Sequence, residues 1–307
     1  MRYYLAPLEG VTSYVYRNAY HKYFRPMDKY FTPFIVPHKE KKFSTREMKE
    51  LSPENNRGLF VVPQLLTNCA EDFLKTASDI TEFGYEEINL NLGCPSGTVV
   101  VKKKGAGFLA YPDELERFLD AIFSKADFRI SIKTRIGKEN PEEFYRLLEL
   151  YNQYPLAELI VHPRIQTDYY KNAPNLEMFD IAYQNAKMPL CYNGDIFTKE
   201  KFEHIRLRFP NTECVMLGRG IISNPDLVNE IENGSNLDYE VLWAFHNQIY
   251  EEYQGISSGE RNVLFKMKEL WSYMENLFPN SEKLMKKIKK TERLKDYEKV
   301  VQVLFER

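Results

Sequence analysis

The sequence predicts an α/β fold, a (β/α)8 TIM barrel followed by a small all-α C-terminal domain. Short segments rich in β-branched and aromatic residues alternate with helical patterns eight times before Gly234, which indicates a parallel sheet with right-handed crossovers. Eight such units within residues 1–235 suit a barrel of about 250 residues. Beyond Gly234 only helical patterns follow. The expected domains are therefore residues 1–235 and 236–307.

Eight segments are predicted as barrel strands because they are almost continuously apolar, as expected for strands buried on both faces. In chain order they are residues 3–6, 30–36, 59–65, 87–93, 129–135, 158–163, 189–194 and 214–220. A doubly wound open sheet is the alternative α/β architecture. No G-x-G-x-x-G sequence follows an early strand, which weakens that alternative.

Helical spacing of apolar residues predicts helices between the strands. In residues 70–84, Phe73, Ala77 and Ile80 form one apolar stripe, and Gly84 provides a stop. Pro112 and the acidic residues after it suit a first helical turn, and Asn140 is a plausible N-cap with Pro141 in the first helical position. The predicted barrel helices are residues 70–84, 112–125, 140–153, 198–209 and 224–234. The predicted helices of the second domain are residues 239–254, 261–277, 281–291 and 296–306.

Composition excludes several classes of protein. The formal net charge of the 307 residues is −2, so no global basic field indicates a nucleic acid partner, and any such partner must meet a local patch. The four cysteines show no metal-binding or disulfide spacing, which favours a reducing, cytoplasmic setting without a structural metal. Pro7 and Glu9 interrupt the N-terminal segment too early for a secretory signal, and no apolar run is long enough to span a membrane.

Polar residues and glycines mark the ends of successive strands, where TIM barrels carry their chemistry. They include an amide, a thiol, a lysine and a histidine, a combination that random turns would not place at consecutive strand ends. In chain order these residues are Pro7, Leu8, Gln64, Asn91, Cys94, Lys133, Arg135, His162, Arg164, Asn193, Gly194, Asp195, Gly218 and Arg219.

The ends of the seventh and eighth strands predict a phosphate site. Loops at these positions commonly bind phosphate through backbone N–H groups. Asn193-Gly194-Asp195 and Gly218-Arg219-Gly220 fit such a site, and the Arg219 guanidinium can add a charge-assisted hydrogen bond. Lys133 would lie across the barrel mouth, where its fixed cation could stabilise a negatively charged ring.

Taken together, these motifs resemble the tRNA-dihydrouridine synthases, flavin-dependent barrel reductases of uridine in RNA. The cysteine-containing element is the most specific of them. The matching stretches are "LAPLEGVT" (5–12), "VPQLL" (62–66), "INLNLGCPS" (88–96), "KKGAG" (103–107), "IKTRIG" (132–137), "VHPR" (161–164), "YNGDI" (192–196) and "VMLGRGIISNPDL" (215–227). They occur in the family's order and span the barrel.

The resemblance implies FMN at the barrel mouth and NADPH as the electron donor. Pro7 and Leu8 would contact the isoalloxazine through their backbone, and Gln64 would hydrogen-bond the ring. Lys133 would face the ring's N1/O2 edge and favour the anionic reduced flavin. His162 would approach the ring or its ribityl tail. The residues expected at the ribityl and phosphate groups are Asn193, Gly194, Asp195, Gly218 and Arg219. Those expected near the substrate are Asn91, Arg135 and Arg164.

The resemblance implies that Cys94 is the catalytic acid. Reduction of uridine needs a hydride at C6 and a proton at C5 from the opposite face. A thiol with an ordinary pKa stays mostly protonated near neutral pH and can supply that proton. Gly93 and Pro95 place Cys94 in a loop rather than in a packed core. Cys69, Cys191 and Cys214 are instead expected to be small buried hydrophobic residues.

Two lysine runs supply the local positive charge that an RNA substrate requires. The target base must be extruded from folded RNA, and contacts elsewhere must offset the cost of extrusion. One run, Lys102, Lys103 and Lys104, lies beside the expected catalytic loop. The other, which contains Lys286, Lys287 and Lys290, lies in the helical domain. We therefore expect tRNA as the substrate, and the family resemblance implies a monomer.

Three alternatives remain open on the sequence. The RNA target could be ribosomal RNA. The protein could be a flavin-dependent barrel oxidoreductase of a small pyrimidine or enone, although the lysine-bearing helical domain argues against that. It could also be a non-catalytic RNA-binding protein, although the presence of Lys133, Cys94 and His162 argues against that.

Overall fold

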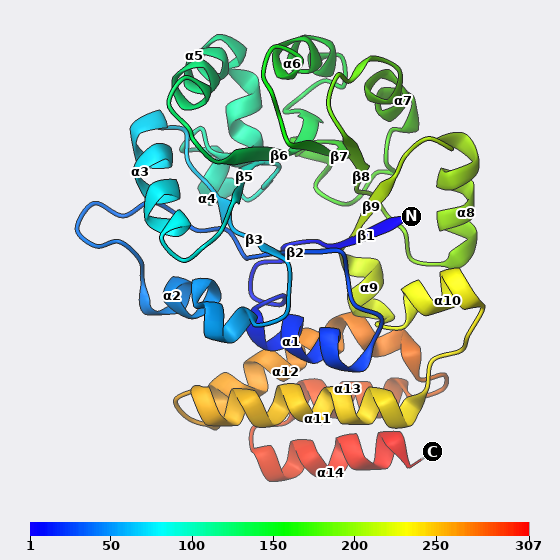
Figure 1. Cartoon of the computed structure of the whole chain (residues 1–307). Helices are drawn as coiled ribbons and strands as arrows, with labels where there is room; N and C mark the ends of the chain where they lie inside the picture. The colour runs from blue at the N-terminus through cyan, green and yellow to red at the C-terminus, as the bar shows by residue number, and fades with distance from the viewer. Residues whose placement is uncertain (307) are drawn as a thin grey trace.

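A parallel β-barrel with helices around it forms the larger part of the computed structural model, which describes residues 1–306. Figure 1 shows the barrel beside a layer of C-terminal helices, with α1 and α9 between the two. The strands are β1 (Arg2–Leu5), β2 (Lys29–Phe31), β3 (Val61–Val62), β4 (Gln64–Leu65), β5 (Glu87–Leu92), β6 (Arg129–Gly137), β7 (Glu158–Ile165), β8 (Leu190–Tyr192) and β9 (Cys214–Leu217). This architecture confirms the predicted TIM barrel with a helical C-terminal region.

The strand order is β3-β2-β1-β9-β8-β7-β6-β5-β4, and all pairs are parallel. β3 and β4 are the two halves of one predicted strand, which Pro63 interrupts because it has no N–H to donate. β3 pairs with β2, and β4 pairs with β5. The broken strand therefore joins the two ends of the sheet and gives the eightfold barrel that the sequence predicts.

Proline also shortens the second strand. The sequence predicts a strand over residues 30–36, but β2 ends at Phe31. Pro33 cannot continue a hydrogen-bonded ladder. The chain returns to the sheet only at Ile35, which forms an isolated bridge with Leu65.

Helices connect the strands and cover the outside of the barrel. They are α1 (Tyr14–Tyr23), α2 (Thr45–Leu51), α3 (Ala70–Thr81), α4 (Gly97–Val100), α5 (Pro112–Phe123), α6 (Glu143–Tyr151), α7 (Leu176–Asn185), α8 (Lys199–Arg208), α9 (Arg219–Ser223) and α10 (Leu227–Asn233). Short 3₁₀ turns occur at η1 (Pro53–Asn56), η2 (Gly105–Ala110), η3 (Gln166–Asp168) and η4 (Glu275–Leu277).

The predicted start of α6 is wrong by two residues, because its first helical residue is Glu143 rather than Pro141. Asn140 is not its N-cap, because the residues before Glu143 form a tighter turn in which Glu143 and Phe144 donate to the carbonyls of Asn140 and Pro141. The Glu143 carboxylate accepts hydrogen bonds from the backbone N–H groups of Lys138, Glu139 and Asn140. A side chain inside the helix therefore takes the place of the expected cap.

The C-terminal helices are α11 (Tyr239–Ile256), α12 (Glu260–Met274), α13 (Glu282–Lys290) and α14 (Leu294–Phe305). They pack on the barrel through α1, and Tyr16 of α1 meets Phe245 of α11 edge to face with ring centroids 5.6 Å apart. One continuous hydrophobic cluster includes both residues. No helix among residues 1–306 is long and apolar enough to cross a membrane.

Cysteines behave in two ways in this fold. Cys191 and Cys214 are fully buried inside the barrel in a cluster with Tyr4, Ile160 and Met216, as expected from sequence. Cys69 is exposed, so the expectation that it is buried is wrong. It occupies the N-cap position of α3, where the chain turns outward from the barrel.

Candidate active site

A cavity opens at the C-terminal ends of β1, β6, β7, β8 and β9, the end of a TIM barrel at which catalysis takes place. It encloses about 530 Å³, counting the space open to solvent. All of the predicted cofactor residues except Gln64 line it, namely Pro7, Leu8, Lys133, His162, Asn193, Gly194, Asp195, Gly218 and Arg219. The fold thus brings together residues that are far apart in the sequence.

Lys133 of β6 lines this cavity, and within residues 1–306 its ammonium group forms no hydrogen bond or ion pair. Removal from water, with a smaller contribution from the Arg135 guanidinium, lowers the pKa of Lys133 to about 8. A cation held away from water without a partner is costly to the folded state. Its position therefore suits a ligand that brings an anionic or electron-rich group into the cavity.

Glycines form the wall of the cavity at the ends of β8 and β9. A Cβ atom at Gly194 would lie 2.8 Å from the Tyr192 hydroxyl, and one at Gly220 would lie 1.8 Å from the Ile196 carbonyl oxygen. A side chain at Gly220 would push apart the segments that follow β8 and β9. Both glycines are buried and line the cavity, so the backbone there can lie close to a ligand and offer N–H groups to an anion.

Asp195 joins two arginines at the same wall. Its carboxylate accepts hydrogen bonds from Arg164 and, at 2.5 Å, from Arg219. Burial alone would raise the pKa of Asp195, but the hydrogen bonds and charges of the two guanidinium groups hold it below its usual value. Asp195 is therefore ionised at neutral pH and fixes the position of Arg219 at the cavity.

His162 of β7 is neutral in this arrangement. Burial, together with the nearby cations Arg135, Lys133, Arg164 and Arg219, holds the pKa of His162 well below its usual value. Nη1 of Arg164 lies 3.0 Å from Nε2 of the ring. Because a guanidinium can only donate, Nε2 is the acceptor and the proton lies on Nδ1. His162 can thus offer an N–H donor to a ligand.

Gln64 belongs to a chain of buried amides rather than to the cavity lining. Its Nε2 donates to Oδ1 of Asn89 at 2.8 Å, and its Oε1 accepts from Nδ2 of Asn91 at 2.7 Å. Oδ1 of Asn91 in turn accepts from the backbone N–H groups of Gly93 and Cys94 at 3.0 and 2.9 Å. These hydrogen bonds fix the orientation of each amide and hold the start of the Cys94 loop.

Cys94 lies in a loop packed against the glycines that follow it. The carbonyl of Cys94 accepts from Ala106 N–H at 3.1 Å. A Cβ at Gly105, whose φ is +55°, would come within 2.9 Å of that carbonyl oxygen. Burial raises the pKa of the Cys94 thiol, an effect that the nearby charges of Arg135 and Lys133 only partly oppose. The sulfur is therefore a protonated thiol at neutral pH.

Arg135 connects this loop to the loop after β7. Its guanidinium donates to the carbonyls of Gly93, Ile165 and Tyr169 at 2.9, 2.8 and 2.8 Å. Arg135 and Arg164 are both buried, and Arg164 also donates to the carbonyl of Asn172. The two arginines expected near the substrate thus use much of their donor capacity inside the protein, to hold the loops that surround the cavity.

Aromatic residues at the cavity rim are absent from the sequence-based set. Tyr170 lines the cavity, and the Arg219 guanidinium lies 4.4 Å from the centre of its ring. Phe197 also lines the cavity, and the centre of its ring lies 5.4 Å from the same guanidinium. The sequence does contain a signal for Tyr170, because "TDYYKN" places two consecutive tyrosines in a loop that follows a predicted strand.

The predicted lysines lie on two surfaces. Lys102 is exposed, whereas Lys103 pairs with Glu114 at 3.1 Å and stacks over Tyr111. On α13 the exposed lysines recur with helical spacing along one stripe, namely Lys283, Lys286, Lys287 and Lys290. Leu284, Met285 and Ile288 occupy the buried side of α13. No group of three or more metal-ligating side chains occurs among the described residues.

Comparison with known proteins identifies what the chain is similar to. The family model "Dihydrouridine synthase (Dus)" matches residues 4–306. "tRNA-dihydrouridine(16) synthase" of Shewanella oneidensis is 26% identical, over 99% of this chain and 97% of its own length. "tRNA-dihydrouridine synthase B" of Pasteurella multocida is 24% identical, over 91% of this chain and 85% of its own.

Solved structures share the fold at low sequence identity. A variant of NCR from Zymomonas mobilis has a TM-score of 0.55 and 15% identity, covering 80% of this chain and 90% of its own. The old yellow enzyme from Trypanosoma cruzi has a TM-score of 0.53 and 10% identity, covering 77% and 89%. At this level of identity the likeness concerns the barrel architecture alone.

Proposed function

Because this chain belongs to the dihydrouridine synthase family, we propose that it reduces the C5–C6 double bond of uridines in tRNA to 5,6-dihydrouridine. The protein is an oxidoreductase of that family. The observation that carries the proposal is the convergence of Lys133, the glycine wall and Arg219 on one cavity, with the Cys94 loop beside it. The names of its relatives support tRNA as the substrate.

FMN is the proposed cofactor, and the residues of the cavity fit it. Lys133 has no partner among the described residues and offers a positive charge to the ring. Gly194, Gly218 and Arg219 suit the phosphate, which would share the Arg219 guanidinium with Asp195. When bound, FMN supplies the hydride for uridine C6 after its reduction by NADPH.

Cys94 is the proposed acid for uridine C5. Its raised pKa keeps the proton on sulfur at neutral pH, where a general acid needs it. Asn91 and Arg135 would position the thiol, because they hold the backbone on either side of Gly93. Tyr170 and the neutral His162 would shape the space into which an extruded base enters.

The helical domain, residues 236–307, is the proposed RNA-binding part of a cytoplasmic monomer. The lysine stripe of α13 and the exposed Lys102 supply positive charge on a chain that is slightly acidic overall. Phosphate contacts dominate the affinity of proteins for nucleic acids. A reductase of small pyrimidines or enones would have no use for this stripe, which is why we rank that alternative second.

Three measurements test the proposal. Purified protein should carry a flavin absorption spectrum, and incubation with NADPH and an unmodified tRNA transcript should produce dihydrouridine detectable by mass spectrometry. Deletion of the gene should remove dihydrouridine from specific positions of cellular tRNA. If tRNA kept all of its dihydrouridine and ribosomal RNA lost it, the substrate would be ribosomal RNA; if neither changed, the proposed activity would be wrong.

A further inference from the structure

A groove lies between the barrel and the helical domain, and residues of α1, α2, α11 and α12 line it. Figure 1 shows where these four helices lie. Its lining includes Gly10 and Tyr14 of the barrel, Arg46 of α2, Ile256 of α11, and Phe265 and Lys266 of α12. The groove encloses about 1160 Å³, counting the space open to solvent. It is distinct from the barrel-mouth cavity, with which it shares no lining residue.

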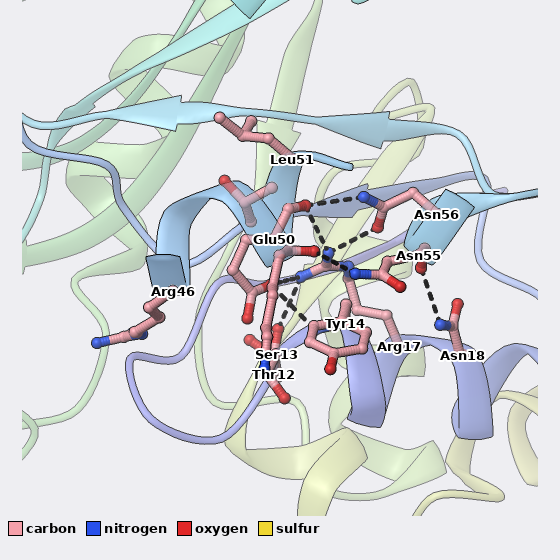
Figure 2. Close-up of polar contacts among 12 residues, drawn as sticks. Thr12, Ser13, Tyr14, Arg17, Asn18, Arg46, Glu50, Leu51, Asn55 and Asn56 are labelled. Carbon is pink, nitrogen blue, oxygen red and sulfur yellow. Dashed lines mark hydrogen bonds and ion pairs between the residues drawn. The ribbon is translucent and has the colours of Figure 1, made fainter. Parts of the chain in front are cut away.

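A buried ion pair makes the barrel side of the groove rigid. Figure 2 shows Arg17 and Glu50 pointing toward each other, with Arg46 directed away from them. Arg17 is fully buried and donates to Glu50 at 2.8 Å and to Asn56 at 2.7 Å. The same Glu50 carboxylate accepts from Tyr14 N–H at 2.9 Å. Arg17 therefore neutralises the Glu50 carboxylate inside the protein, and that negative charge does not oppose an anion in the groove.

The helical side of the groove presents large apolar side chains to solvent. Phe265 is 65% exposed and Ile256 is 42% exposed. Both residues line the groove. An exposed aromatic ring in a concave surface is a platform on which an unpaired base can stack, whatever the identity of that base.

Cations lie in the groove and beside it. Lys49 lines the groove, and Arg261 lies one helical turn before Phe265 on the same face of α12. Both are exposed, and neither forms an ion pair with any other part of the chain that the structure describes. Arg46 pairs with Glu9, and Lys266 donates to the carbonyl of Gly10 at 2.7 Å. Lys49 and Arg261 are therefore the charges free to meet phosphate groups.

We propose that this groove binds one unpaired nucleotide of the RNA substrate, with its base stacked on Phe265 and its flanking phosphates near Lys49 and Arg261. The inference rests on the proposed function, since it assumes an RNA substrate. It also has a geometric basis, because Gly10 of the groove is only two residues from Leu8 of the barrel-mouth cavity, at most about 7 Å along the chain. An RNA strand at the barrel mouth can reach both sites.

Substitution of Phe265 tests the stacking contact. Phe265→Ala should weaken binding of an unmodified tRNA transcript by roughly five- to a hundredfold, the range found for loss of one base–aromatic stack. The dependence of affinity on salt should not change, because the ring carries no charge. Phe265→Tyr should restore the affinity, and Phe265→Trp should report the contact directly through quenching of its fluorescence when the transcript binds.

Substitution of the two cations, in contrast, should change the salt dependence of binding. Lys49→Gln and Arg261→Gln should each reduce the salt dependence of binding, by about one unit of the log–log slope.

Val303→Ala is the matched control for Phe265→Ala, since Val303 is 48% exposed on α14. The affinity of this control variant for the transcript should equal that of the original protein.

The outcomes separate this inference from the proposed function. If the original protein neither binds the transcript nor forms dihydrouridine, both are wrong. If it does both, but Phe265→Ala binds equally well and the tryptophan at this position is not quenched, the groove inference alone is overturned.

Discussion

At the scale of single residues, the site depends on groups whose protonation is set by their surroundings. Lys133 lines the cavity with no counter-charge among the residues that the structure describes, and partial burial lowers its pKa to about 8. Burial raises the pKa of the Cys94 thiol and lowers that of His162. One cation, one neutral acid and one neutral imidazole can therefore coexist at neutral pH near the same cavity.

The affinity for FMN should depend on pH through Lys133. A bound anionic or electron-rich ligand favours the charged ammonium of Lys133 and therefore raises the pKa of Lys133. Above pH 8 the complex then keeps a proton on Lys133 that the free protein has lost. Affinity should therefore fall as pH rises above about 8, by at most about tenfold per pH unit. Titration of flavin-free protein with FMN at pH 7, 8 and 9, followed by flavin fluorescence, measures this.

Lys133→Met should bind FMN more weakly at pH 7 and lose the pH dependence. Lys125→Met is a suitable control, because Lys125 is exposed just beyond α5. An affinity of the original protein that stays constant from pH 7 to 9 would contradict the role proposed for Lys133.

Loss of the Cys94 thiol should separate the two halves of the reaction. Cys94→Ala should slow dihydrouridine formation by about 10²- to 10⁴-fold, the usual contribution of a general acid, while NADPH still reduces the flavin. Anaerobic stopped-flow absorption follows flavin reduction, and mass spectrometry follows the product. Cys69→Ala, which removes an exposed thiol, should leave both rates unchanged; normal product formation by Cys94→Ala would remove Cys94 from the mechanism.

At the scale of structural elements, hydrogen bonds between loops position the groups to which the proposal assigns the reaction. Arg135 of β6 holds the loops after β5 and β7 together through three backbone carbonyls. The amide chain from Asn89 through Gln64 to Asn91 reaches the same Cys94 loop from inside the barrel. The strand ends thus supply residues that organise the loops as well as residues that face the cavity.

Arg135→Lys should loosen both loops although it conserves the charge. A lysine ammonium cannot reproduce the planar fork that reaches three carbonyls. We expect the free energy of unfolding to fall by about 2–4 kcal/mol and hydrogen exchange to increase in residues 93–97 and 165–172. Arg129→Lys, on the exposed start of the same strand, is the control. Unchanged exchange in both loops would show that Arg135 does not hold them.

At the scale of the whole molecule, the barrel and the helical domain form one packed unit. One hydrophobic cluster extends through both parts of the molecule and includes Tyr16 and Tyr20 of α1 and Phe245 of α11. Removing the helical domain would expose this core to water, so truncation cannot separate RNA binding from catalysis. Point substitutions on the outer surface of α13 are the better test.

Neutralising the lysine stripe should weaken RNA binding without affecting the barrel. Lys286→Gln combined with Lys287→Gln should lower the affinity for tRNA and reduce the log–log salt slope by about two, because each lysine would neutralise about one phosphate. Fluorescence anisotropy across a salt series measures both quantities. Lys289→Gln is the control, because Lys289 lies off the stripe and pairs with Glu275 at 2.5 Å. A slope unaffected by the double substitution would mean that the stripe does not meet RNA.

Local sequence patterns were sufficient to predict the barrel. Continuous apolar segments that alternate with helices are typical of parallel strands covered by helices, and eight such units suit a closed barrel. Where prediction failed, the cause was local chemistry, such as the missing N–H of Pro33 or the Glu143 carboxylate that replaces the expected cap. The strand-end residues that line the cavity could be identified because barrel geometry places all strand ends on one rim.

By itself the sequence determined the fold, the family resemblance, and the lysine, histidine, amide and thiol available for chemistry. Only the tertiary structure decided which of these face the cavity and which are used internally. Gln64 and Arg135 hold the framework, while Tyr170 and Phe265 are exposed beside cations. The physical reason is that hydrogen-bond partners and burial depend on contacts between distant segments, which no local pattern of residues encodes.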